Sequence, residues 1–126
     1  MGFSVKTDFD PDNGIFIKYY YGNIELEDIF DSWRETIRKK KIPENVRKFI
    51  INYKKASINF PPERVSDIAK FYNEHDAVFG NARIAMVMES PGQVVFPNLI
   101  VLEKISFKIE TFYTMEAAVN WLANMP

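Results

Sequence analysis

Apolar and polar residues alternate near the start of the chain, and the spacing then becomes helical. The segment from Phe3 to Phe9 alternates with a period of two, which is typical of a half-buried strand. The turn-forming run Asp-Pro-Asp-Asn-Gly at 10–14 follows, and a β-branched and aromatic run occupies 15–21. The pattern therefore predicts an N-terminal β-hairpin.

Two helical patterns flank a short apolar run at 46–53. The first begins near Glu25 and ends before Pro43, and the second begins at 61–63 and ends near Gly80. A short β-branched and aromatic block between two helices is typical of a buried strand in a mainly parallel sheet. We therefore predict 46–53 as the central strand, with a break into a loop at Lys54.

The second half of the chain continues the alternation of strands and helices. An almost continuously apolar run at 82–88 predicts a buried strand, and 107–112 alternates like a peripheral strand. Between them, the apolar stretch 93–105 predicts a helix that is apolar on nearly every side. Thr114, with Thr111 as the alternative, is predicted to cap a last helix. The expected fold is α/β, with a mixed sheet of about five strands and about four helices.

The order and motifs of these elements resemble the STAS and SEC14-like families, whose SpoIIAA-like domains include anti-sigma-factor antagonists. The resemblance covers almost the whole chain. Its motifs are Gly-Ile-Phe-Ile at 14–17, Gly-Asn-Ile at 22–24, Phe-Ile-Ile-Asn-Tyr at 49–53, and Thr-Met-Glu-Ala-Ala-Val-Asn-Trp-Leu at 114–122. These are packing and capping patterns, so the resemblance implies a SpoIIAA-like fold more directly than an activity.

The resemblance also implies two kinds of site. STAS antagonists are phosphorylated on a serine after the central strand, and Ser57 is the serine in that region here. The Asp-Ser pair of that motif is missing, and Lys54 and Lys55 intervene. SEC14-like relatives hold a lipid in an apolar cavity, which implies that 94–105 lines or gates one.

The composition narrows the classes of function. With 126 residues the chain fits one domain, 1–126. It has no cysteine. Its 16 basic and 17 acidic residues nearly cancel, so the chain has no overall positive charge that would attract nucleic acid. The start of the chain has no signal-peptide pattern, and no apolar run is long enough to span a membrane. We therefore expect a cytoplasmic protein without a nucleic-acid partner.

No catalytic, phosphate-binding or metal-binding motif stands out, so no catalytic residue, cofactor or metal is expected. Tyr19, Tyr20 and Tyr21 suggest a stacking platform, but neighbouring strand residues face opposite sides of a sheet, which favours packing. The sequence instead favours a non-enzymatic interaction module that binds a protein partner or self-associates through helix 93–105 and the loop after the central strand. The alternative is a carrier or sensor of a small apolar ligand or lipid. The candidate surface residues are Lys54, Lys55, Ser57, Val94, Val95, Phe96, Leu99 and Ile100.

Overall fold

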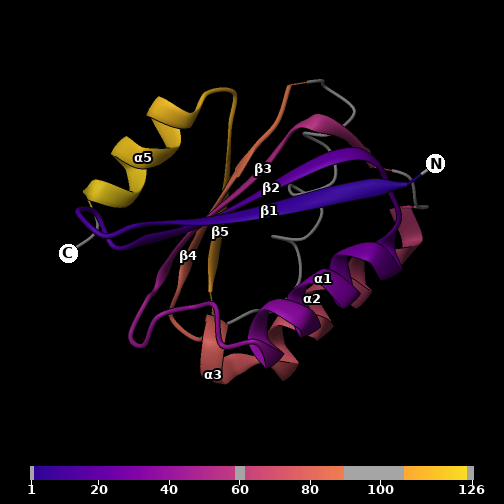
Figure 1. The fold of residues 1–126 in the computed structure, drawn as a ribbon, viewed down its shortest axis with the longest axis horizontal. Helices are drawn as coiled ribbons and strands as arrows, with labels where there is room; N and C mark the ends of the chain where they lie inside the picture. The colour runs from indigo at the N-terminus through magenta and orange to yellow at the C-terminus, as the bar shows by residue number, and fades with distance from the viewer. Residues whose placement is uncertain (1, 59–61, 90–106, 125–126) are drawn as a thin grey trace.

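A computed structural model describes residues 2–58, 62–89 and 107–124 of the chain, and Figure 1 shows the arrangement of its elements. In chain order the elements are β1 (Phe3–Asp10), β2 (Ile15–Ile24), α1 (Leu26–Arg38), β3 (Lys48–Ile58), the short 3-10 helix η1 (Pro62–Arg64), α2 (Val65–Glu74), α3 (Asp76–Phe79), β4 (Arg83–Val87), β5 (Lys108–Phe112) and α5 (Met115–Ala123).

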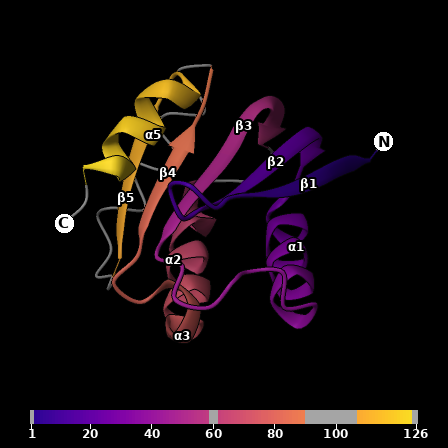
Figure 2. The same ribbon diagram turned by 60° about the vertical axis from the view of Figure 1, so that its left-hand side comes forward.

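The strands form one five-stranded sheet in the order β1-β2-β3-β4-β5. β1 is antiparallel to β2, and the remaining neighbours are parallel. α1, α2 and α3 lie on one face of the sheet, and α5 lies on the other (Figures 1 and 2). The predicted α/β fold, its mixed sheet, its N-terminal hairpin and its central strand are therefore confirmed.

The core is built on β3, whose side chains alternate between the two faces. Phe49, Ile51 and Tyr53 join the cluster beneath α1 and α2, and Ile50 joins the cluster beneath α5. Trp33 of α1 is 0% exposed and lies 4.9 Å, centroid to centroid, from the ring of Phe79. Apolar side chains on both faces explain why the central strand reads as a continuous apolar run.

Local polar contacts define where the helices begin and end. At the start of α1, the backbone N–H of Glu25 donates to Asp28 Oδ2 at 2.9 Å. At the start of α5, Thr114 Oγ1 accepts from the N–H of Ala117 at 3.1 Å, so the predicted cap is confirmed. Gly80 follows the last residue of α3, as predicted for the end of this helical region.

The expected break at Lys54 is wrong. β3 continues to Ile58 because β2 is also long, and the two strands remain paired as far as Ile24 and Ile58. Lys54, Lys55 and Ser57 are therefore strand residues rather than loop residues, and Ser57 does not lie at the start of a helix.

The second predicted helix is divided into η1, α2 and α3. The predicted helix 93–105 lies outside the described residues. The candidate surface residues that fall in it are Val94, Val95, Phe96, Leu99 and Ile100.

Candidate functional site

A bulge in β3 shapes the polar face of the sheet. Tyr19 is paired with Asn52 and Tyr21 with Lys55, so β3 uses one residue more than β2 over this interval. At the bulge, the backbone N–H of Lys54 does not take part in the regular hydrogen bonds between β2 and β3. It donates instead to Asn52 Oδ1 at 2.9 Å, so the side chain of Asn52 replaces the missing acceptor.

The pairing determines which side chains share a face. Because paired residues of neighbouring strands point to the same side, Tyr19, Tyr21 and Lys55 lie on the face opposite α1. Tyr20 points to the α1 face, where it is 1% exposed and stacks on Tyr53 with ring centroids 5.2 Å apart. The predicted alternation of the three tyrosines is confirmed, and packing accounts for Tyr20.

A pocket of about 330 Å³ opens where this bulge meets the end of β4. Its lining residues are Tyr19, Tyr20, Tyr21, Asn52, Lys54, Lys55 and Glu89. We call it the tyrosine-lysine pocket. It lies toward the carboxyl ends of the parallel strands, the region where open α/β sheets commonly bind ligands.

The pocket combines positive charge with phenol donors. Among the described residues, two lysines line it against one glutamate. Burial raises the pKa of Tyr19, and the charges of Asp8 and Tyr21 raise it further, so this phenol stays protonated at neutral pH. Ammonium groups and neutral phenols are hydrogen-bond donors suited to a carboxylate or phosphate beside a planar or apolar group.

The structure brings together some of the sequence-predicted residues and adds others. Lys54 and Lys55 both line the pocket, whereas Ser57 is exposed further along β3 and is paired with Asn23. Sequence reasoning missed Tyr19 and Asn52 as pocket residues. A polar Asn52 inside an apolar strand was the available signal, because such a residue often marks an irregularity in the backbone.

A second polar group that the sequence reasoning missed lies on the opposite face of the sheet. Lys18 of β2 is 0% exposed, and its Nζ lies 2.5 Å from Ser32 Oγ of α1. The available signal was its place between Phe16 and Tyr20, two buried residues that share its face. A lysine at such a position must be buried with the core unless the strand ends there.

Within residues 2–58, 62–89 and 107–124, no cluster of three or more histidine or carboxylate side chains is placed to hold a metal ion. No helix in these ranges is long and apolar enough to cross a membrane.

Comparison with known proteins identifies the fold. No protein-family model matches the chain, and no curated protein matches it significantly. A solved structure of an uncharacterised protein of the DUF3478 family from Shewanella loihica, described as having a SpoIIAA-like fold, superposes with a TM-score of 0.60. The two sequences are 15% identical, and the match covers 96% of this chain and 94% of the other. The chain therefore has a SpoIIAA-like fold.

Proposed function

We propose that the protein is a non-enzymatic binding module that recognises an acidic segment of a protein partner at the tyrosine-lysine pocket. The observation that carries this proposal is the meeting of Lys54, Lys55 and the Tyr19 and Tyr21 side chains in one concavity. The SpoIIAA-like fold supports it, because that fold suggests an interaction or regulatory module.

The chemistry of the pocket favours an acidic partner over an apolar one. Lys55 is exposed and Lys54 is partly exposed, so both ammonium groups are available to a carboxylate that approaches from solvent. The partly exposed rings of Tyr19 and Tyr21 add apolar contact area beside those charges. Exposed ion pairs alone contribute little, so the aromatic area is needed for useful affinity.

The geometry also favours an extended segment of a protein. β2 and β3 run side by side past the end of β4, and Ser57 and Asn23 continue the same polar face beyond the pocket. A peptide lying along these strands would place successive acidic side chains over Lys54 and Lys55. Its approach would be steered by charge and weakened by salt.

A charge-reversal experiment tests the proposal. The affinity for a hexaglutamate peptide would be measured by calorimetry at low and moderate salt. K54E/K55E is expected to lower the affinity at least tenfold and to remove most of its salt dependence. K70E/K108E is the matched control, because it makes the same change in net charge at two exposed lysines on α2 and β5. Equal losses in both variants would show a non-specific charge effect and would contradict the proposal.

A second candidate function, carriage of a small apolar ligand, is favoured by a different cavity. This cavity of about 650 Å³ lies between the segment that follows α1 and the helix α3. Ile37, Ile42 and Val46 give it apolar walls, and Lys40 and Arg47 place two positive charges there against the one negative charge of Glu44. These groups suit an apolar molecule with an acidic end. Native mass spectrometry tests this function: an added mass that disappears on denaturation supports it, and a bare protein mass contradicts it.

Self-association through 93–105 stays a prediction. Leu99→Asp is expected to convert a dimer into a folded monomer in sedimentation experiments if this segment is an interface. Loss of cooperative unfolding in the same variant would instead assign the segment to the core.

A further inference from the structure

Lys18 and Ser32 form a polar pair between β2 and α1, on the face of the sheet opposite the tyrosine-lysine pocket. The Lys18 side chain is fully buried, whereas Ser32 is partly exposed. Lys18 Nζ and Ser32 Oγ are 2.5 Å apart, and the Tyr20 hydroxyl also reaches Ser32 Oγ at 3.3 Å. Solvent therefore reaches the serine more easily than it reaches the lysine.

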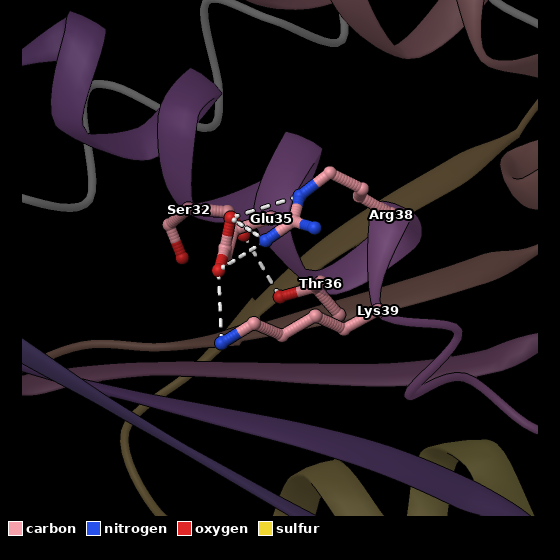
Figure 3. Close-up of polar contacts among 5 residues, drawn as sticks. All are labelled: Ser32, Glu35, Thr36, Arg38 and Lys39. Atoms are coloured by element: carbon pink, nitrogen blue, oxygen red, sulfur yellow. Dashed lines mark hydrogen bonds and ion pairs between the residues drawn. The ribbon is translucent and has the colours of Figure 1, made fainter.

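Among the described residues, no carboxylate forms an ion pair with Lys18. Glu35 lies one turn along α1 from Ser32, but Figure 3 shows its carboxylate directed to Arg38 and Lys39. Glu35 Oε2 is 2.9 Å from the nitrogen of each of these two side chains. This carboxylate is therefore neutralised by other cations.

The groups around Lys18 disfavour its charged form. On the same face of the neighbouring strands its partners are the uncharged residues Thr7 and Ile51, and the Trp33 ring of α1 lies against it. Burial, with the positive charge of Lys41 as a smaller cause, lowers the pKa of Lys18 to about 7. A large fraction of the protein therefore carries a neutral amine at this position near neutral pH.

We propose that Ser32 is a covalent modification site, whose hydroxyl is activated by the Lys18 amine 2.5 Å away and accepts an acyl group from an activated ester. Lys18 Nζ takes the proton from Ser32 Oγ as Oγ attacks the carbonyl carbon of the donor. A new ester bond joins Oγ to that carbon, the bond to the leaving oxygen breaks, and the leaving group departs as its anion. The proton remains on Lys18 until it passes to solvent.

The helical setting predicts a single acylation rather than turnover. Ser32 lies in the interior of α1, where its backbone N–H bonds within the helix and does not form an oxyanion hole. The ester would also separate water from Lys18, the group needed to activate that water for hydrolysis. The modification is independent of the tyrosine-lysine pocket, and it places an acyl group beside the contact between α1 and β2.

Reaction with p-nitrophenyl acetate tests the proposal. Peptide mapping by mass spectrometry is expected to find one hydroxylamine-sensitive acetyl ester on Ser32, distinct from hydroxylamine-resistant amides on surface lysines. The rate of ester formation is expected to rise with pH around neutrality and to level off once Lys18 is neutral. Ser32→Ala should abolish the ester, and Ser57→Ala should leave its rate unchanged.

Lys18→Met retains the length of the side chain and removes the base. It therefore shows whether Ser32 reacts because Lys18 activates its hydroxyl or only because Ser32 is exposed to solvent. The acetylation rate of Ser32 is expected to fall at least tenfold in this variant, provided that its circular dichroism matches the wild type and that it melts cooperatively. If the variant does not fold, the pH dependence of the wild-type acetylation rate decides whether Lys18 acts as the base. An unchanged rate in folded K18M, an adduct on Lys18 in place of Ser32, or a flat pH profile would overturn the proposal.

Discussion

The Nζ atom of Lys18 lies 4.0 Å from the centroid of the Trp33 ring, and both side chains are 0% exposed. A desolvated cation over an indole face gains about 2 kcal/mol. Burial of an ammonium without a carboxylate partner costs several kcal/mol, so this attraction offsets only part of the penalty. The lowered pKa of Lys18 is the consequence.

Lys18→Met is expected to stabilise the protein most at low pH. The pKa of Lys18 is about 7 when folded and about 10.4 when unfolded, so the unfolded state binds more protons between these values. Wild-type stability should therefore gain a contribution from this group as the pH rises from about 7 to about 10. Below about pH 7 Lys18 is charged in both the folded and the unfolded state. The wild type then bears the full cost of burying the ammonium group.

Urea unfolding at about pH 6 and about pH 10 measures this effect. Lys18→Met should raise the free energy of unfolding by roughly 2–4 kcal/mol at the lower pH and by much less at the higher one. Subtracting the free energy of unfolding of the wild type from that of the variant at each pH cancels the contributions of the other titrating groups and leaves that of Lys18. A difference that does not change with pH would contradict the assignment.

Gly22→Ala is expected to destabilise the protein more than Gly14→Ala. Both glycines have positive φ angles, +89° and +67° respectively. A Cβ on Gly22 would lie 2.8 Å from the carbonyl oxygen of Gly2, whereas a Cβ on Gly14 would meet nothing within 4 Å. Gly14→Ala should cost about 1–2 kcal/mol from its backbone angle alone, and Gly22→Ala should cost more. Equal losses in urea unfolding would argue against the close approach of β1 and β2.

Thr114→Ala is expected to lower the free energy of unfolding by about 1 kcal/mol, because it removes the acceptor for the N–H of Ala117. Thr114→Ser keeps the hydroxyl and is the matched control, with a change near zero. Thermal and urea unfolding of both variants provide the comparison. A loss of the same size in the serine variant would assign the effect to the methyl group rather than to the cap.

Patterns that depend on one element alone were predictable from the sequence. The hairpin was predicted from alternation and turn residues, and the start of α5 from Thr114. The extension of β3 past Lys54 was not, because it depends on pairing with the second half of β2. The burial of Lys18 was also missed, since hydrophobic periodicity treats an isolated lysine as exposed, whereas the position of α1 over β2 determines its surroundings.

Two of the pocket residues followed from the sequence for a reason that proved wrong. Lys54 and Lys55 were expected in a loop after the central strand, but they line the pocket as residues of β3. Tyr19 joins them only because β2 and β3 are neighbours, a relationship that hydrophobic periodicity does not contain. The register of strands, rather than the pattern within a strand, assembles this site.

Ser57→Glu is expected to weaken binding of an acidic peptide several-fold. Ser57 is exposed and lies two residues from Lys55 on the same face of β3, so a phosphate or carboxylate there would compete for the same cations. Ser57→Asn keeps the position polar and uncharged and should bind like the wild type. Calorimetry with hexaglutamate compares them, and equal affinities in all three proteins would show that a negative charge at Ser57 does not compete for Lys54 and Lys55.

A titration of the isotope-labelled protein with hexaglutamate, followed through its backbone amide NMR signals, would locate the peptide-binding site on the chain. We expect saturable shifts concentrated at Tyr19, Tyr21, Asn52, Lys54 and Lys55, the residues that meet at the β3 bulge. The same shifts should be largely absent in K54E/K55E. Shifts confined to other lysines, or none at all, would contradict the assignment of the tyrosine-lysine pocket as the binding site.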